Sequence, residues 1–344
     1  MSAAAGVVLN CLFPSETKFR FSDDEVDGII KCASFHRSDL EHSVIWFEPS
    51  VHEKIRDSIK EPFDRAPNPG LSPLDRLPPE LLHNVLLRLD MLSLFNLRQT
   101  SIRLRQMVHS LKQYKLIVHH GLNFFCALLR TQHAIHVSLL DVYTALRTRD
   151  CELCGDFAGF VFLPTWIRCC FLCLQSDART EMHRTYSARK RLKLTQSDMK
   201  QLTPFRTLPG LYGGTIAVDT FERRYHQALV SSHQIQEITG KQDWSMSDER
   251  RLLTLMASCA LPYYHENTGR IERGMSCYGC DLGTIYFTMN GLTQTIYETR
   301  YTRETFLKHF AICKLAQRKW TSKMSREEFY TAGPSLLIEM SDAV

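Results

Sequence analysis

Two pairs of cysteines in the middle of the chain constrain its fold more than any other feature of the sequence. Cys151 and Cys154 are separated by two residues, as are Cys170 and Cys173, and 15 residues (155–169) lie between the pairs. Two C-x-x-C pairs at such a spacing are typical of a four-cysteine zinc site. Each pair forms a tight turn in which both thiolates face one metal ion, and two turns complete a tetrahedron with Zn–S distances of about 2.3 Å. The spacing therefore predicts a structural zinc site with four ligands: Cys151, Cys154, Cys170 and Cys173.

Other uses of these cysteines stay open from the sequence. They could be reduced core thiols or a redox pair, and the first pair could share a metal with a third pair, Cys277 and Cys280. Twelve cysteines in 344 residues is too low a density for a small secreted disulfide scaffold. Paired cysteines in a chain without a secretory signal more often bind metal. Four cysteines with no nearby partner are expected to be ordinary core or surface thiols: Cys11, Cys32, Cys126 and Cys259.

The third pair, Cys277 and Cys280, needs two further ligands. Apolar residues recur at helical spacing over residues 304–320, which predicts a helix there. His309 and Cys313 are four residues apart in that segment, so they would lie on one face of the helix. The alternative is that His309 is an ordinary helix histidine. The predicted ligands of a second zinc site are one histidine and three cysteines: Cys277, Cys280, His309 and Cys313.

A β-hairpin is predicted between the two halves of this second site. Residues 284–301 contain Asn290 and Gly291, a pair that favours a tight hairpin turn. The gap of 28 residues (281–308) between the cysteine pair and His309 is longer than in the usual zinc finger. Four protein ligands leave no open position for water, whereas a catalytic zinc keeps one. Both predicted sites are therefore structural, and two zinc ions are expected per chain.

One apolar stretch has the length of a membrane span, but its composition argues against that role. Residues 157–174 include Pro164 and Arg168, and three cysteines lie within the last six residues. A charge at the centre of a bilayer costs ~2.5–3.5 kcal/mol, so no transmembrane segment is expected. Residues 1–13 lack the basic region that opens a signal peptide. The chain is therefore expected in the cytoplasm, the nucleus or both.

A dense run of apolar residues over 77–111 predicts three short helices. Pro78 and Pro79 suit a first helical turn, where the missing N–H is not needed, and Glu80 complements the positive end of the helix dipole. Asp90 then interrupts the run of leucines. The apolar positions cover more than one helix face, and a segment this short cannot bury such a surface by itself. Either the rest of the chain covers it or it binds a partner.

Residues 77–90 resemble the opening of an F-box, with the sequence Leu-Pro-Pro-Glu-Leu-Leu-His-Asn-Val-Leu-Leu-Arg-Leu-Asp. The resemblance continues through residues 93–94, 97–101 and 103–105. F-box proteins bind the Skp adaptor of cullin–RING ubiquitin ligases, so the resemblance implies an adaptor-binding surface. It assigns that surface to six residues: Leu77, Pro78, Leu81, Val85, Leu86 and Leu89.

The residues after this motif resemble the bodies of a large class of fungal F-box proteins. Patterns such as Arg-Cys-Cys-Phe-Leu-Cys-Leu at 168–174 and Leu-Pro-Gly-Leu-Tyr at 208–212 recur in that class. The expected fold class is α+β, with a small mixed body held by structural zinc. The expected divisions are an N-terminal extension and linker (1–70), the F-box (71–111), a helical connector (112–150) and the zinc-stabilised mixed body (151–344).

The resemblance implies a substrate-recruiting subunit of a Skp–cullin–F-box ubiquitin ligase. The F-box of such a chain binds the adaptor and, through it, a cullin. Its body binds a target protein, which is unknown here. The chain itself is not an enzyme. The sequence contains no P-loop, dinucleotide-binding fingerprint or Gly-x-Ser-x-Gly elbow. The net charge of +5 is small for a nucleic-acid-binding domain, so neither nucleic acid nor a membrane is an expected partner. The alternative is a non-degradative F-box scaffold or nucleic-acid-linked regulator that uses its zinc modules and the basic run at 189–193.

Overall fold

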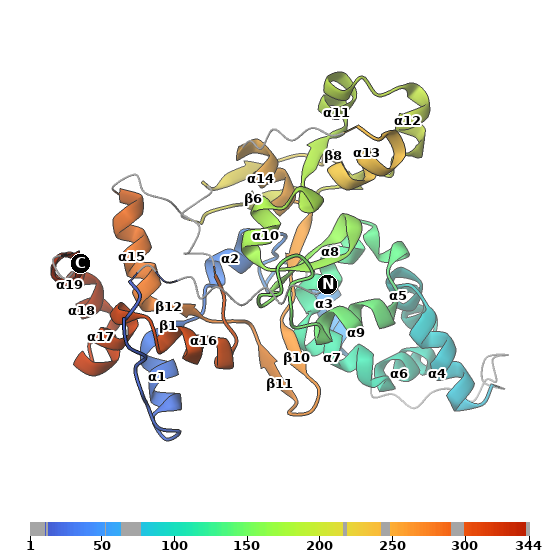
Figure 1. Cartoon of the computed structure of the whole chain (residues 1–344). Coiled ribbons are helices and arrows are strands. Elements are labelled where there is room, and N and C mark those ends of the chain that lie inside the picture. Colours follow the sequence, from blue (N-terminus) through green and yellow to red (C-terminus); the bar gives the residue numbers. More distant parts are fainter. Residues whose placement is uncertain are drawn as a thin grey trace, which may run out of the picture.

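The computed structural model describes residue 11 and residues 13–51, 53–62, 77–215, 219–241, 248–289 and 299–341. These residues form helices and small antiparallel sheets, which confirms the predicted α+β class. Figure 1 shows helices α4–α9 on one side of the molecule, helices α15–α19 on the other, and α11–α13 above them. Within the described ranges, none of the helices combines the length and the apolar character that a membrane crossing needs.

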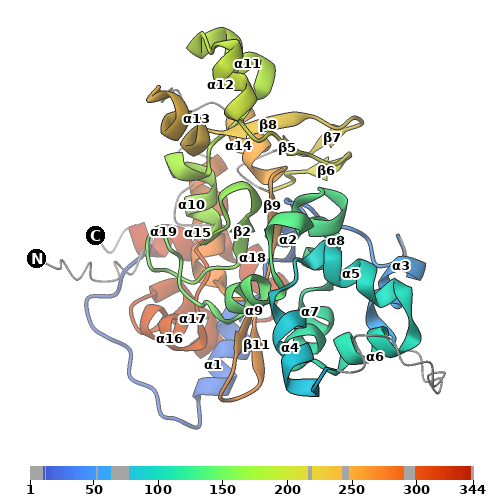
Figure 2. The ribbon, with the colours of Figure 1, turned by 90° about the vertical axis from the view of Figure 1, so that its right-hand side faces the viewer.

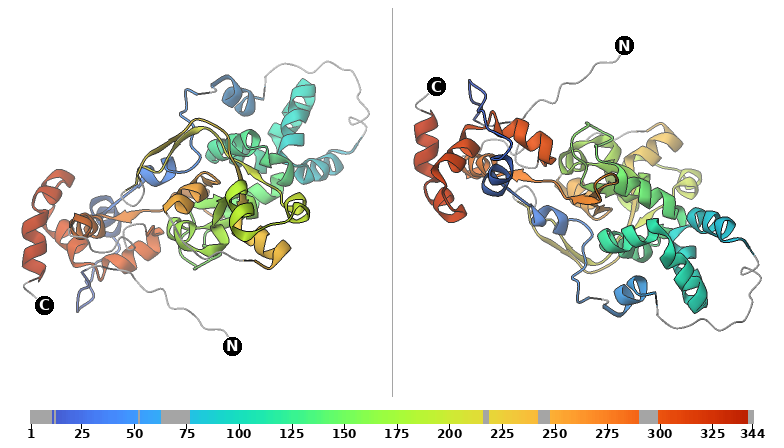
Figure 3. Two further views of the ribbon diagram at one scale, coloured as in Figure 1. Left: turned by 90° about the horizontal axis from the view of Figure 1, so that it is seen from above. Right: turned by 90° about the horizontal axis from the view of Figure 1, so that it is seen from below.

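The N-terminal region contacts both ends of the molecule. Helix α1 (Val26–Ala33) packs against the C-terminal helices α16 (Arg303–Phe310) and α17 (Lys314–Ser322), as Figure 2 also shows. Strand β1 (Ser34–Phe35) pairs with strand β12 (Ser276–Cys277), and α2 (Ser38–His42) follows. Helix α3 (Glu53–Lys60) instead packs against α7 (Lys112–His120) at the other end, so this region runs along the length of the molecule (Figure 3).

The three helices predicted over 77–111 are present, and local side chains fix where they begin. They are α4 (Pro79–Arg88), α5 (Met91–Thr100) and α6 (Ile102–Ser110). Asp90 caps α5 by accepting a hydrogen bond from the Ser93 amide at 2.8 Å, and Ser101 caps α6 by accepting from the Leu104 amide at 3.2 Å. The segment that follows is helical, as predicted, and consists of α7, α8 (Leu122–Arg130), the 3₁₀ helix η2 (His133–His136) and α9 (Leu139–Arg147).

The apolar stretch at 157–174 forms a buried hairpin and a short helix. Its elements are β2 (Phe160–Phe162), the 3₁₀ helix η3 (Leu163–Thr165), β3 (Ile167–Cys169) and α10 (Phe171–Ser176). Strand β2 also pairs with β9 (Ser258–Ala260), which gives a sheet of order β3-β2-β9. All three residues of β2 are buried, so the apolar character of this stretch comes from its place in the core.

A second sheet, of order β4-β8-β5, lies beside a group of short helices. After η4 (Ala178–Thr180), its strands are β4 (Met182–Arg184), β5 (Phe205–Arg206) and β8 (Ala228–Ser231). The helices of this part are α11 (Thr185–Leu192), α12 (Gln196–Gln201), α13 (Ser232–Thr239) and α14 (Asp248–Leu255). Two separate hairpins are β6 (Gly210–Tyr212) with β7 (Phe221–Arg223), and β10 (Tyr263–His265) with β11 (Arg270–Glu272), of which the second packs against α9.

The predicted hairpin over 284–301 is wrong in its first part. Helix α15 (Tyr278–Met289) follows directly after β12 and includes residues 284–289. The expected turn at Asn290 and Gly291 lies outside the described residues. Helices α16, α17, α18 (Arg326–Thr331) and α19 (Gly333–Ser341) complete the chain.

The single helix predicted over 304–320 is also wrong, because the segment is broken between α16 and α17. Cys313 has extended backbone, with φ −91° and ψ 98°. Its extended conformation allows an antiparallel bridge to Pro14, and the Lys314 amide donates to the Phe13 carbonyl at 3.0 Å. Pairing with the N-terminal segment therefore overrides the helical pattern of the sequence here.

Most buried apolar residues belong to one large core that extends from Leu40 to Tyr264. It contains Leu86 from the F-box helices, Tyr114 from α7 and Phe160 from the body. The domain limits predicted at residues 111 and 150 therefore fall inside one continuous core. A second core joins α1 to the C-terminal helices, and a smaller third one lies under α11 and α13.

Arg98 joins helix α5 to the N-terminal region. Its guanidinium is 1% exposed, donates to the Ser58 and Glu61 carbonyls at 3.0 and 3.1 Å, and lies 4.8 Å from the centre of the Tyr114 ring. Burial lowers the pKa of Arg98, but these carbonyls at the end of α3 accept the hydrogen bonds of the charged form.

We expect Arg98→Ala to lower the free energy of unfolding by about 2–4 kcal/mol, because it leaves two carbonyls unpaired and removes a cation–π contact. Urea denaturation measures this difference. Arg88→Ala, at an exposed position of α4, is the control and should change stability by less than about 0.5 kcal/mol. Equal effects of the two substitutions would show that Arg98 does not brace α3.

Candidate functional site

One face of α4, together with Leu77 just before it, is apolar and is not covered by the rest of the described chain. Leu77, Leu81 and Val85 are 39%, 54% and 48% exposed. They are spaced four residues apart, which places Leu81 and Val85 on one side of the helix. Leu82 and Leu86, by contrast, are 2% and 1% exposed and pack in the large core. The helix is thus held by one face and presents a second apolar face to solvent, where a partner can bind.

The six residues assigned to adaptor binding fall into two groups. Leu77, Pro78, Leu81 and Val85 are exposed. Leu86 is buried, and Leu89 is half-buried against the core, where its carbonyl accepts a hydrogen bond from the Leu139 amide at 3.2 Å. The exposed group is therefore available to a partner, whereas Leu86 and Leu89 hold the helix in place.

The first cysteine cluster brings together the two pairs that the spacing predicted. The Sγ atoms of the four residues all lie within 4.8 Å of one another: Cys151, Cys154, Cys170 and Cys173. Two of these atoms, of Cys154 and Cys170, are 3.7 Å apart. A tetrahedral zinc with Zn–S distances of about 2.3 Å requires sulfurs about 3.8 Å apart. The alternative in which the first pair meets Cys277 and Cys280 is not what the structure shows.

Backbone turns point the sulfurs of this cluster inward. Gly155 has φ +85°, a conformation that glycine adopts easily, and its amide donates to the Cys151 carbonyl at 2.8 Å. The Leu153 amide donates to the Cys151 Sγ at 3.4 Å, and the Cys173 amide donates to the Cys170 Sγ at 3.3 Å. Amide donors of this kind stabilise negative charge on sulfur. The local fold therefore favours thiolates at this position.

The thiols of the first cluster perturb one another strongly. Hydrogen bonds from Cys170 and Cys173 lower the pKa of Cys151, and a hydrogen bond from Cys170 lowers the pKa of Cys154. The pKa of Cys170 is raised in turn, chiefly by its hydrogen bond with Cys151. Thiolate character is thus already favoured on the first pair, and a cation would favour it on all four sulfurs.

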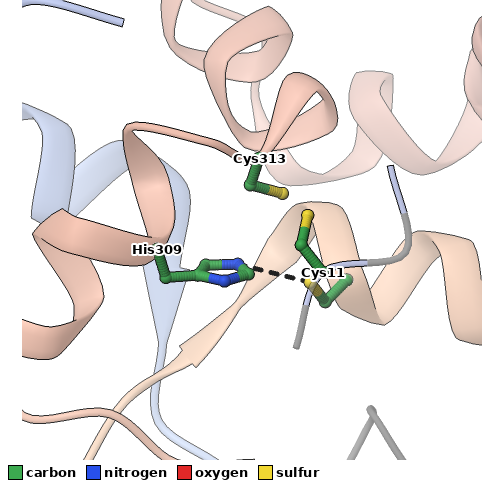
Figure 4. A group of neighbouring side chains, drawn as sticks. Cys11, His309 and Cys313 are labelled. Carbon is green, nitrogen blue, oxygen red and sulfur yellow. Dashed lines mark hydrogen bonds between the residues drawn. The ribbon is translucent and has the colours of Figure 1, made fainter. Parts of the chain in front are cut away.

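The second cluster lies between the C-terminal helices. The donor atoms of Cys11, Cys280, His309 and Cys313 all lie within 4.8 Å of one another. Cys277 also belongs to this site, because its Sγ is 3.8 Å from the Cys313 Sγ. Figure 4 shows Cys11, His309 and Cys313 turned toward a common centre. The structure thus brings together all four predicted residues and adds a fifth donor, Cys11.

The imidazole of His309 is placed for metal binding by its neighbours. Its Nε2 lies 3.3 Å from the Cys280 Sγ, and its Nδ1 lies 3.2 Å from the Tyr301 hydroxyl. A partner at Nδ1 fixes the ring orientation and leaves Nε2 for the centre of the cluster. His309 is 0% exposed. An ordinary helix histidine would not explain why its ring is buried among cysteine sulfurs.

In the second cluster, hydrogen bonds between the thiols favour thiolates on Cys11 and Cys277 and raise the pKa of Cys280 and Cys313. Hydrogen bonds from Cys280 and Cys313 lower the pKa of Cys11 to about 4. Burial opposes ionisation of Cys277, but hydrogen bonds from the same two thiols outweigh it and hold its pKa well below the ordinary range. Burial would lower the pKa of His309, and the neighbouring charge of Cys277 raises it instead.

Both clusters could hold a metal ion. Thiolate and imidazole are the ligands that Zn²⁺ prefers in tetrahedral structural sites. Cys169, which is buried next to Cys170, is not part of the first cluster. Cys11 could not be found from the sequence, because no nearby cysteine or histidine at ligand spacing marks it.

A serine and a histidine also meet in the body, but not as a nucleophile and its base. The Ser232 Oγ donates to Glu181 Oε2 at 3.0 Å and lies 2.6 Å from His183 Nε2. Because the carboxylate takes the serine proton, Nε2 must donate to the serine rather than accept from it. Glu181 is itself paired with Arg250, and both are 4% exposed. Ser232 is half-buried, and the other three residues of this hydrogen-bonded network are buried.

Comparison with known proteins supports the reading of the exposed face. Residues 74–116 match the family model of the F-box domain. Within the described residues, the match covers α4, α5 and α6 and the first part of α7. Neither the search of curated proteins nor the search of solved structures found a match. The helices, their capping residues and the family match agree, and the chain contains an F-box domain at residues 74–116.

Proposed function

We propose that the protein is the substrate-recruiting subunit of a Skp–cullin–F-box ubiquitin ligase. F-box domains bind a Skp adaptor and, through it, a cullin scaffold. The observation that carries the proposal is the uncovered apolar face formed by Leu77, Leu81 and Val85 inside the matched domain. A face of this kind is costly to leave in water and is typical of a surface that a partner covers.

In this proposal the chain acts by proximity and not by bond chemistry. The F-box domain binds the adaptor, and the body after it binds a target protein. The ligase then presents the target's lysines to the ubiquitin carrier at a high effective concentration. The continuous core supports a chain that holds adaptor and target at a fixed distance, because Leu86 of the F-box helices and Phe160 of the body pack in the same core.

Binding to the adaptor tests this proposal directly. The full chain mixed with a purified Skp adaptor is expected to elute from a size-exclusion column as an equimolar complex, with a Kd in the micromolar range or tighter. Addition of the matching cullin should shift this complex to a larger size. Separate elution of chain and adaptor at micromolar concentrations would contradict the proposal.

We further propose that each cluster binds one structural zinc ion. Four thiolates would hold the first ion: Cys151, Cys154, Cys170 and Cys173. The second would be held by four donors of the C-terminal cluster, which contains the predicted Cys277, Cys280, His309 and Cys313 together with Cys11. The support is the short distances between buried soft donors, which match a tetrahedral site. Bound zinc would fix the packing of the loops that carry these residues, and elemental analysis is expected to find two zinc ions per chain.

A further inference from the structure

Cys11 reaches the C-terminal cluster because the residues after it pair with the backbone around Cys313. Pro14 and Cys313 form an antiparallel bridge, and the Lys314 amide donates to the Phe13 carbonyl at 3.0 Å. These bonds fill the break between α16 and α17. The same contact that interrupts the helix therefore places the Cys11 sulfur among the other donors.

A backbone hydrogen bond and two aromatic contacts also hold residues 19–21 of this segment in place. The Phe19 amide donates to the Ala311 carbonyl at 2.8 Å. The rings of Phe19 and Phe21 contact the Phe310 ring edge-on, with centroids 5.6 and 5.9 Å apart. Residues 13–21 are thus docked on α16 by backbone pairing and by aromatic packing, and Cys11 lies two residues before this docked segment.

The C-terminal cluster offers more donors than a four-coordinate zinc needs. Five side chains contribute one donor atom each: Cys11, Cys277, Cys280, His309 and Cys313. Four of them, including Cys11, lie within 4.8 Å of one another. The donors other than Cys11 all come from residues 277–313, whereas Cys11 comes from the opposite end of the chain.

We propose that Cys11 is a ligand of the C-terminal zinc centre, so that zinc bound there fastens the N-terminal segment to the C-terminal helices. This inference rests on the zinc centre proposed above. Because the metal binds Cys11 only when residues 13–21 are docked, zinc binding and docking must stabilise each other. The same N-terminal region continues to α3, whose end is bound by Arg98 of the F-box helices.

Competition with a chromophoric zinc chelator tests this assignment on the full chain. Cys11→Ser is expected to weaken the second zinc ion at least ~10-fold while the first stays bound. Cys280→Ser should weaken the second ion at least as much as Cys11→Ser does, and it marks the effect of losing a predicted member of the cluster. Cys32→Ser is the matched control, since Cys32 lies in the same N-terminal region but outside both clusters, with its Sγ 3.7 Å from the Lys319 carbonyl.

Limited trypsin digestion gives a second readout that does not depend on metal counting. The side chains of Lys18 and Arg20 are exposed, but the backbone between them is fixed by the Phe19 hydrogen bond. In the wild-type chain, cleavage at these two sites should become several-fold faster when zinc is removed. In Cys11→Ser, cleavage should be fast even with zinc present, whereas Cys32→Ser should behave like the wild type.

Two results would overturn the assignment, and they can be told apart. If the wild-type chain binds two zinc ions and Cys11→Ser binds both as tightly as Cys32→Ser does, the zinc centre stands and Cys11 is not its ligand. If the wild-type chain binds only one zinc ion and Cys170→Ser binds none, the C-terminal cluster holds no zinc, so the proposed centre fails and the assignment of Cys11 fails with it.

Discussion

A chain in which Leu81 and Val85 are both replaced by glutamate is expected to bind the Skp adaptor at least ~100-fold more weakly than the wild type. Both side chains are about half exposed, so the change removes apolar contact from the interface without opening a cavity in the core. It also places two carboxylates where the adaptor would have to desolvate them. The Kd measured by isothermal titration calorimetry gives the size of the effect, and an unchanged thermal unfolding curve shows that the fold is intact.

The matched control for this prediction is Leu211→Glu. Leu211 lies on β6 and is 64% exposed, so it is at least as accessible as the residues of α4. It lies outside the matched F-box domain, and its replacement should leave adaptor affinity within about two-fold of the wild type. Equal weakening by both variants would point to a general effect of added charge and not to an interface on α4.

The second large effect is expected from Cys170→Ser. Loss of one of four ligands should release the zinc ion of the first cluster and lower the zinc content from two ions to one per chain. Structural zinc contributes about 10–16 kcal/mol to small zinc-binding peptides, and we expect a loss of at least ~3 kcal/mol here. In a chain of 344 residues, with an unfolding entropy of ~2.1 cal/mol/K per residue, this loss corresponds to a decrease in Tm of at least ~4 °C.

Cys169→Ala is the matched control, because Cys169 is the adjacent residue and is fully buried but lies outside the cluster. It should keep two zinc ions and lose only about 1 kcal/mol of stability. Zinc content and Tm are measured for the two variants side by side. Retention of two zinc ions by Cys170→Ser would remove this residue from the ligand set, and an equal loss of stability in both variants would attribute the effect to core packing.

The parts of the structure that the sequence predicted correctly are those specified by neighbouring residues. The starts of the three F-box helices are set by Pro79 in the first turn of α4 and by the N-caps Asp90 of α5 and Ser101 of α6, each of which acts within one turn. The first cysteine cluster was predictable for the same reason, because its two turns lie close together in the chain and each carries its own spacing signal.

The errors arise where distant segments meet. The apolar periodicity of residues 304–320 continues through the break at Cys313, and only the pairing with Pro14 interrupts the helix. That pairing also delivers Cys11, which has no spacing signal because its partners lie at the far end of the chain. Local pattern cannot reveal a contact that depends on the tertiary arrangement of α16 and α17.

The exposed fractions separate the six residues predicted to bind the adaptor into an exposed group and a more buried group, which sequence similarity alone cannot do. Leucines at 81, 82 and 86 are chemically identical, yet Leu81 is half exposed and the other two are buried. Neighbouring leucines on a helix point in directions about 100° apart, and which of them faces the core depends on what packs behind the helix. For α4, that neighbour is α9 of the connector.

Hydrogen–deuterium exchange of the full chain, alone and with a saturating Skp adaptor, tests the central claim most directly. If the uncovered face of α4 is the adaptor-binding surface, the amides of residues 79–88 should exchange several-fold more slowly in the complex. Those of the C-terminal helices α16 and α17 should not change. A complex that forms with unchanged exchange over residues 79–88 and protection elsewhere would contradict the account.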